Sequence, residues 1–137
     1  MELFVYGSLL SEERNHRYLA GSRKLGDGQT AAEYILVDLG AYPALLEGGA
    51  TSVRGEVYEV DAATLAAVDA FEGHPVLYRR APVRLATGEQ VAGYLLQQRE
   101  LAAGRPIIPE GDWRRWTRLR VATERGGDPR EASHERG

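Results

Sequence analysis

Two short stretches of the sequence combine residue types that could bind and convert a small polar molecule. The first is Tyr6-Gly7-Ser8-Leu9, which ends a short β-favouring run that begins at Leu3. A glycine at the end of a strand lets the backbone turn sharply and lets a ligand approach closely. The amides that follow can then point outward as donors to a carboxylate or an oxyanion. The simpler interpretation is that Gly7 and Ser8 only end the strand.

The second stretch is the end of an Ala-rich segment, Ala62 to Phe71, which has high helix propensity. If this helix continues through Glu72, one face holds Leu65, Val68 and Glu72, with Asp69 beside them. A carboxylate at a helix C-terminus opposes the macrodipole, and burial disfavours its charged form, so both effects would raise the pKa of Glu72. A glutamate with a pKa near neutrality suits proton transfer. The alternative is that Glu72 is an ordinary surface acid and that Asp69 pairs with Arg79 or Arg80.

Three other motifs that could indicate a functional site are excluded by the residues around them. The segment Gly26 to Ala31 fits a dinucleotide-binding pattern, but no strand precedes it and no helix follows it, so we expect a loop there. Ser8 has no glycine two residues to either side, which excludes a nucleophile elbow. His16, His74 and His134 lack the spacing of metal ligands, so we expect neither a metal nor a cofactor.

The composition narrows the classes of function further. The 137 residues are 43% hydrophobic and 27% charged, which is typical of one globular domain. Cysteine is absent, which excludes disulfides and thiol nucleophiles and fits the cytoplasm. No apolar run is long enough to span a membrane, and the N-terminus does not have the pattern of a signal peptide. We therefore expect a cytoplasmic protein with no membrane partner.

The charge balance argues against nucleic acid as a partner. The formal net charge is −3, so no overall field attracts polyanions. Basic and aromatic residues alternate only between Trp113 and Arg120, and such runs usually form a solvated face of a helix or strand. The pattern shows no heptad and no obvious apolar patch, so it assigns no oligomeric state.

The elements that must position these residues are short strands and one clear helix. Asp61 is a suitable N-cap for that helix, and Gly73 with Pro75 ends it. A further helix is expected within Ser11 to Leu19. The expected strands are Leu3 to Tyr6, Ala31 to Leu39, Tyr42 to Leu46, Val53 to Val60, Leu77 to Ala86 and Gln90 to Gln98. Hairpin-length links predominate, so we predict an α+β fold with a mostly antiparallel sheet, either open or closed on itself. We place the domain at residues 1–121 and a flexible tail at 122–137, which has no large apolar residue.

Several of these motifs, taken together, resemble the γ-glutamylcyclotransferase-like, or AIG2-like, superfamily. The resemblance covers about residues 2–116 and is nearest to γ-glutamylamine cyclotransferases and small bacterial relatives. It rests on Phe4-Val5-Tyr6-Gly7-Ser8-Leu9, Asn15-His16-Arg17, Gly55-Glu56-Val57-Tyr58, Asp69-x-Phe71-Glu72-Gly73, Tyr78-x-Arg80 and Gly111-Asp112-Trp113.

The resemblance implies a small, mostly antiparallel β-barrel flanked by short helices. Its cavity would be lined by the Tyr6–Leu9 loop and a buried glutamate, which is Glu72 here. The loop backbone would hold the α-carboxylate and amine of a γ-glutamyl group, and Glu72 would act as the general acid/base. Tyr78 would either donate to the developing oxyanion or pack beside Glu72.

The implied reaction converts a small-molecule γ-glutamyl amine into 5-oxoproline and a free amine. The α-amine attacks the γ-amide carbonyl of the same molecule, so no covalent enzyme nucleophile is needed. A second reading is release of a γ-glutamyl protecting group from a larger amine metabolite. A third, of a different class, is a non-catalytic module of the same fold that binds or senses a small metabolite.

Overall fold

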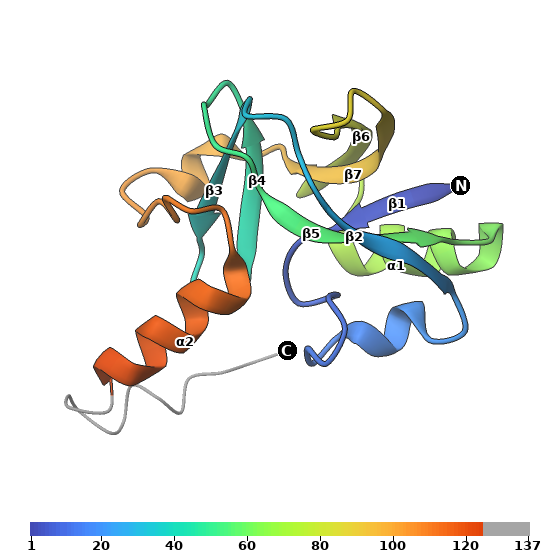
Figure 1. Ribbon diagram of the computed structural model, residues 1–137, viewed down its shortest axis with the longest axis horizontal. Coiled ribbons are helices and arrows are strands. Elements are labelled where there is room, and N and C mark those ends of the chain that lie inside the picture. The colour runs from blue at the N-terminus through green and yellow to red at the C-terminus, as the bar shows by residue number, and fades with distance from the viewer. Residues whose placement is uncertain (125–137) are drawn as a thin grey trace.

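The computed structural model describes residues 1–124 and has a mixed α+β architecture (Figure 1). The elements in chain order are β1 (Glu2–Val5), the 3-10 helix η1 (His16–Leu19), β2 (Arg23–Gln29), β3 (Tyr34–Asp38), β4 (Pro43–Glu47), β5 (Arg54–Glu59), α1 (Ala62–Glu72), β6 (Tyr78–Arg84), β7 (Gln90–Leu96), the 3-10 helix η2 (Arg99–Ala102) and α2 (Trp113–Glu124). The predicted α+β class is therefore confirmed.

The larger sheet has five strands in the order β2-β5-β1-β7-β6. Each neighbouring pair is antiparallel except β1 and β7, which are parallel. An isolated bridge between Thr30 and Leu85 connects the chain just after β2 with the chain just after β6, so the two edge strands approach each other there. The mostly antiparallel sheet agrees with the sequence pattern, whereas closure into a barrel stays a prediction.

Strand β1 lies in the middle of this sheet, and both of its faces are buried. Leu3 and Val5 contact one half of the hydrophobic core, and Phe4 and Tyr6 contact the other half. All four side chains are at most 7% exposed. The loop that follows β1 therefore leaves from one of the best-packed parts of the molecule, which favours a fixed loop position.

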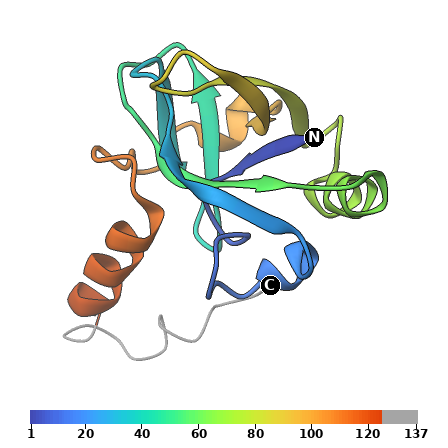
Figure 2. The ribbon, with the colours of Figure 1, turned by 45° about the vertical axis from the view of Figure 1, so that its right-hand side comes forward.

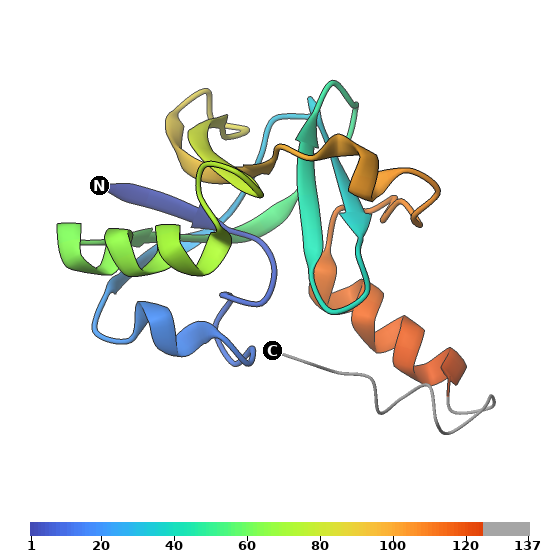
Figure 3. The same ribbon diagram turned by 180° about the vertical axis from the view of Figure 1, so that it is seen from behind.

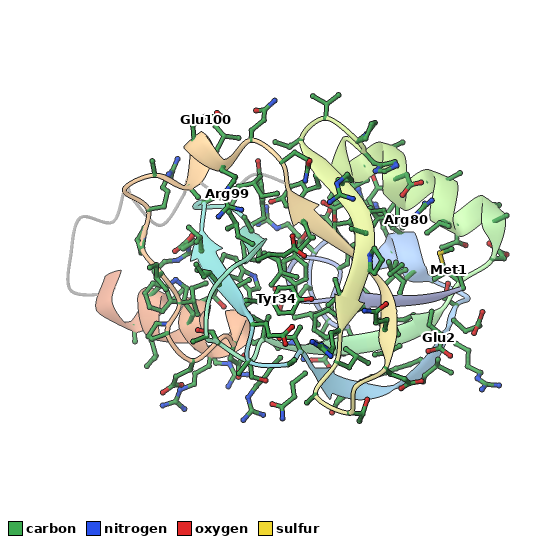
Figure 4. All side chains as sticks on the ribbon, turned by 90° about the horizontal axis from the view of Figure 1, so that it is seen from above. Met1, Glu2, Tyr34, Arg80, Arg99 and Glu100 are labelled. Carbon is green, nitrogen blue, oxygen red and sulfur yellow. The ribbon has the colours of Figure 1, made fainter. Side chains whose placement is uncertain are left out.

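Strands β3 and β4 form a separate two-stranded sheet. Figure 4 shows Tyr34, at the start of β3, near the centre of the molecule between this hairpin and the β6–β7 hairpin. Its hydroxyl oxygen accepts a hydrogen bond of 2.9 Å from the Arg84 backbone N–H. Pro43 begins β4, which agrees with the strand expected over Tyr42 to Leu46.

Helix α1 confirms the predicted helix and both of its ends. The Asp61 side chain accepts a hydrogen bond from the Thr64 backbone N–H at 2.8 Å, and Gly73 adopts the left-handed conformation that ends the helix. Figure 3 shows α1 and η1 together on one side of the molecule, while α2 lies on the other side; Figure 2 shows the same separation. Glu72 is thus the last residue of a well-defined helix.

Two expectations differ from the structure. The segment Gly26 to Ala31, expected as a loop, contributes Gly26 to Gln29 to β2, which pairs with β5. This edge strand is largely exposed and polar, so it has no apolar alternation that could have revealed it. The segment Ser11 to Leu19 forms only the short 3-10 helix η1.

The C-terminal part of the described chain is helical. Helix α2 continues past residue 121 to Glu124, and the rest of the predicted tail lies outside the described residues. No helix in residues 1–124 is both long and apolar enough to cross a membrane.

Candidate active site

The residues singled out in the sequence come together around one cavity of about 240 Å³. It lies where the end of β1, the end of α1 and the starts of β4 and β6 meet. Its lining includes every predicted site residue, namely Tyr6, Gly7, Ser8, Leu9, Glu72 and Tyr78. The remaining lining residues are Phe4, Val5, Asn15, Tyr42, Pro43, Phe71, Leu77 and Tyr94.

Glycine at position 7 is required by a close approach within the protein. A Cβ atom on Gly7 would lie 2.6 Å from Cγ and 2.7 Å from Cδ of Pro43, which is closer than van der Waals contact allows. The Leu10 backbone N–H donates to the Gly7 carbonyl at 3.0 Å, which closes a tight turn. Glycine is therefore needed at this position for the close approach of Pro43 as well as for the turn.

In the loop after β1, two backbone carbonyls accept hydrogen bonds from other segments, while three backbone N–H groups have no acceptor. The Ser8 carbonyl accepts from the Asn15 backbone N–H at 3.0 Å, and the Leu9 carbonyl accepts from His16 Nδ1 at 2.9 Å. Within residues 1–124, the N–H groups of Gly7, Ser8 and Leu9 donate to no acceptor. Consecutive unpaired amides of this kind are able to bind a carboxylate or an oxyanion.

Glu72 is the acidic residue of the cavity. Burial raises the pKa of its side chain from 4.5 to about 7. Among residues 1–124, no hydrogen bond or ion pair engages the Glu72 carboxylate. A carboxylate with this pKa can both accept and donate a proton near neutral pH.

Two tyrosine hydroxyls of the cavity lining are each bound to a backbone carbonyl. The Tyr6 hydroxyl donates to the Tyr94 carbonyl at 2.7 Å, and the Tyr78 hydroxyl donates to the Pro43 carbonyl at 2.9 Å. Burial, and then the negative charge of Glu72, raises the pKa of Tyr78 well above its ordinary value. These tyrosines are neutral near pH 7. Among the residues that line the cavity, Glu72 is the only one with a side-chain pKa near 7.

Asp69, the second acid predicted near the helix end, has a structural role. Its carboxylate lies 2.6 Å from Nη1 of Arg80 and accepts a 2.7 Å hydrogen bond from the Tyr94 hydroxyl. Of the two partners predicted for it, Arg79 and Arg80, the structure has Arg80. Asp69 thus connects α1 to β6 and β7 and is not among the residues that line the cavity.

Glu56 on β5 carries a buried carboxylate, 2% exposed, to which the sequence assigned no role. Ser11 donates to it from its backbone N–H at 2.8 Å and from its hydroxyl at 2.7 Å. Further contacts come from Tyr58, Lys24 and Arg114 at 2.9, 3.3 and 3.2 Å. Burial alone would raise the pKa of Glu56, but these hydrogen bonds lower it to about 2. In the sequence, Glu56 stands within the motif Gly55-Glu56-Val57-Tyr58 and on the same strand face as Tyr58 and Val60.

His16 is a further residue whose function the sequence did not reveal. Besides its contact with Leu9, its ring packs on Tyr58 at 5.6 Å between centroids. His74 accepts a hydrogen bond from the Arg80 backbone N–H through Nδ1 at 3.0 Å. Within residues 1–124, no group of three or more His, Asp or Glu side chains is arranged to hold a metal ion.

The chain is similar to known proteins both in sequence and in structure. Residues 3–115 match the sequence profile of the family described as Gamma-glutamyl cyclotransferase, AIG2-like. A Vibrio cholerae protein that carries the name gamma-glutamylcyclotransferase provisionally is 45% identical over 111 residues, which cover 81% of this chain and 93% of that protein. Human gamma-glutamylaminecyclotransferase is 37% identical over 116 residues, covering 78% of this chain and 71% of the human protein. The crystal structure of c4763, a uropathogenic Escherichia coli protein, superimposes with a TM-score of 0.73 at 27% identity and covers 85% of this chain and 94% of that one.

Proposed function

Because the chain belongs to the gamma-glutamyl cyclotransferase, AIG2-like family, we propose that it is a γ-glutamylamine cyclotransferase whose general acid/base is Glu72. Its substrate is a small γ-glutamyl amine, and its products are 5-oxoproline and a free amine. One observation carries this proposal: an unpaired carboxylate with a pKa of about 7 faces the same cavity as three unpaired backbone amides.

The reaction needs one proton acceptor that later acts as a proton donor. Ionised Glu72 takes a proton from the α-ammonium group, and the freed amine attacks the γ-carbonyl carbon of the same molecule. The bond between that carbon and the amide nitrogen then breaks, while Glu72 returns the proton to the leaving nitrogen. After the attack the ring nitrogen still carries one extra proton, which Glu72 also takes and passes to the released amine, so that the amine leaves as an ammonium ion. Two protons thus move from the α-nitrogen to the leaving nitrogen, water is not consumed, and the enzyme forms no covalent intermediate.

Binding geometry supplies much of the rate acceleration, because the attack is intramolecular. The γ-glutamyl chain must be folded so that its amine and its γ-carbonyl meet, and this requires that both of its ends are held. The amides of Gly7, Ser8 and Leu9 hold the α-carboxylate, and Glu72 acts at the α-nitrogen and the scissile amide. A cavity of about 240 Å³ suits the γ-glutamyl group with the amine portion extending outside.

Tyr78 contributes mainly by shaping the cavity beside Glu72. Its hydroxyl proton is directed at the Pro43 carbonyl, which favours the packing role over donation to an oxyanion. The contact also connects β6 to the start of β4, and Pro43 in turn lies against Gly7. Tyr78 therefore helps to fix the loop that binds the substrate carboxylate.

The direct test is to incubate the protein with γ-glutamyl-ε-lysine and simple γ-glutamyl amides and to quantify 5-oxoproline. We expect 5-oxoproline and free amine in equal amounts. The matched α-glutamyl amides serve as controls, because their amine is attached at the α-carbonyl and closure of the five-membered ring onto the γ-carbon cannot release it. If no γ-glutamyl amine yields 5-oxoproline although the protein binds 5-oxoproline, the protein is a binding module of this fold.

A further inference from the structure

One side chain of the cavity has a hydrogen-bond donor that the protein itself leaves unused. Asn15 lines the cavity, and its side chain is 3% exposed. Among residues 1–124, its Nδ2 atom is buried and has no hydrogen-bond partner. The other side-chain atom, Oδ1, accepts a long hydrogen bond of 3.5 Å from Arg17.

The local fold does not explain why an amide is buried at this position. The loop contacts of Asn15 use its backbone: its N–H donates to the Ser8 carbonyl at 3.0 Å, and its carbonyl accepts from the Tyr18 N–H at 3.2 Å. Most residue types could make both bonds. Buried polar groups are nearly always paired, and an orphaned donor is unfavourable. An acceptor brought into the cavity by a ligand would remove this cost.

The charges around the cavity indicate what that acceptor is. No lysine or arginine is among its lining residues, so a bound anion must be held by neutral donors. The available donors on this side are the amides of Gly7, Ser8 and Leu9 together with Asn15, which lies beside them through its bond to Ser8. A cation here would also stabilise ionised Glu72 and lower its pKa, whereas neutral donors have less effect on it.

We propose that Asn15 Nδ2 donates a hydrogen bond to the α-carboxylate of the γ-glutamyl group and thereby selects substrates that carry this carboxylate. The inference rests on the proposed function, because it takes the γ-glutamyl group as the ligand. Asn15 is therefore a binding residue, and the proton transfers remain with Glu72. A carboxylate has enough lone pairs to accept from the loop amides and from Asn15 together.

The wild-type protein allows a test that needs no substitution, because Asn15 is the only asparagine of the chain. Labelling asparagine with ¹⁵N in its side chain gives one pair of NH₂ signals by NMR. We expect these signals to shift when 5-oxoproline is added and to stay unchanged with 2-pyrrolidinone, the same lactam without the carboxylate. The proposal would be overturned if the signals did not shift with 5-oxoproline, or if they shifted equally with both lactams.

Two substitutions of similar shape measure the effect on turnover. Asn15→Leu removes the donor, and Asn15→Asp places a negative charge beside the substrate carboxylate. A hydrogen bond to a charged group accounts for about a 10- to 100-fold change, so we expect kcat/KM for a γ-glutamyl amide to fall by about that factor in Asn15→Leu and further in Asn15→Asp. The corresponding 4-aminobutyryl amide, which lacks the α-carboxylate, should be converted equally by the wild type and Asn15→Leu. An equal loss on both substrates would mean a structural role and contradict the proposal.

The two hypotheses fail in different ways. If the wild type releases no 5-oxoproline from any γ-glutamyl amine, the proposed function is wrong. If the wild type is active and Asn15→Leu keeps its full kcat/KM, only the assignment of Asn15 is wrong. Thermal unfolding of each variant shows whether it is folded, and the NMR experiment remains decisive if a variant is not.

Discussion

At the level of single residues, two glutamates illustrate how environment decides what a carboxylate can do. Glu56 accepts hydrogen bonds from Ser11, Tyr58, Lys24 and Arg114, and its pKa falls to about 2. Glu72 is half-buried and has no such donors, and its loss of solvation raises its pKa to about 7. The first is permanently charged and holds the fold together, and the second can exchange a proton near neutral pH.

The raised pKa of Glu72 predicts a pH-dependent cost to stability. A folded-state pKa above the ordinary 4.5 means that ionisation is disfavoured in the folded protein, so stability is lost as the pH rises from about 4.5 to about 7. Glu72→Gln removes this cost. We expect the variant to exceed the wild type by at most about 3 kcal/mol at about pH 8 and to match it near pH 4, as measured by urea unfolding.

A matched control separates this effect from a general change in charge. Glu47 is exposed at the end of β4, so Glu47→Gln should leave the pH dependence of the free energy of unfolding as it is in the wild type. A difference between Glu72→Gln and the wild type that stays constant from about pH 4 to about pH 8 would contradict the raised pKa.

The same residue sets the pH dependence of catalysis. Glu72 must be ionised to accept the proton of the α-ammonium group, so kcat/KM should rise with pH and level off above an apparent pKa near 7. The measurement is the pH–rate profile for a simple γ-glutamyl amide. A profile that is flat between about pH 5 and about pH 8 would argue against Glu72 as the acceptor.

At the level of elements, the site depends on how the end of β1 packs against the start of β4. Gly7→Ala would place a methyl group 2.6 Å from Cγ of Pro43, and the proline ring has little freedom to move aside. We expect a loss of about 1–3 kcal/mol in the free energy of unfolding, together with reduced turnover because the loop amides shift. Both are measured on the purified variant by urea unfolding and by 5-oxoproline release.

Gly28 provides the control for this substitution. A Cβ atom at Gly28 would make ordinary contact with Val57 at 3.5 Å, and the residue lies on β2 away from the cavity. Gly28→Ala should therefore leave turnover near the wild-type level. If Gly7→Ala is as stable and as active as Gly28→Ala, the close approach of Pro43 does not shape the site.

Some elements could be predicted from sequence and others could not, for physical reasons. Helix α1 has local signals at both ends, Asp61 and Gly73, and the β6–β7 hairpin has alternation and a short turn, so both were correct. Strand β2 owes its existence to pairing with β5 at an exposed edge, and its own residues carry little preference.

In the site, too, residues positioned by a single element could be predicted, whereas residues positioned by contacts between distant segments could not. Glu72 could be proposed because its position depends on one helix, and the Tyr6–Leu9 loop because it ends one strand. The support from His16 for the Leu9 carbonyl and the unpaired Asn15 amide depend on how η1 folds back onto that loop. The partners of Glu56 come from four separate segments, which no local pattern reveals.

At the level of the whole molecule, the Glu56 cluster connects parts of the chain that lie far apart in sequence. Its members are Ser11 in the loop after β1, Lys24 on β2, Tyr58 on β5 and Arg114 on α2. Arg120 on α2 forms a second connection to buried Asp38 on β3 at 3.0 Å. Some of the arginines between Trp113 and Arg120 thus attach a helix to the core.

This cluster predicts a loss of stability in acid. The pKa of Glu56 is lowered from 4.5 to about 2, so its contribution is fully present above about pH 4.5 and is lost as the pH falls towards 2. A shift of this size corresponds to a contribution of at most about 3 kcal/mol. Glu56→Gln should be less stable than the wild type at about pH 7, and the difference should shrink as the pH falls towards 2 in urea unfolding. A difference independent of pH would mean that the charge of Glu56 is not what holds the cluster.

The account as a whole depends on one carboxylate that transfers protons in a cavity lined by unpaired amides. The most direct measurement compares 5-oxoproline release from a γ-glutamyl amide by the wild type and by Glu72→Gln, with 5-oxoproline binding measured on both proteins. We predict turnover by the wild type, a rate at least about 100-fold lower in Glu72→Gln, and similar binding of 5-oxoproline. A Glu72→Gln variant that keeps most of the wild-type rate would contradict the account.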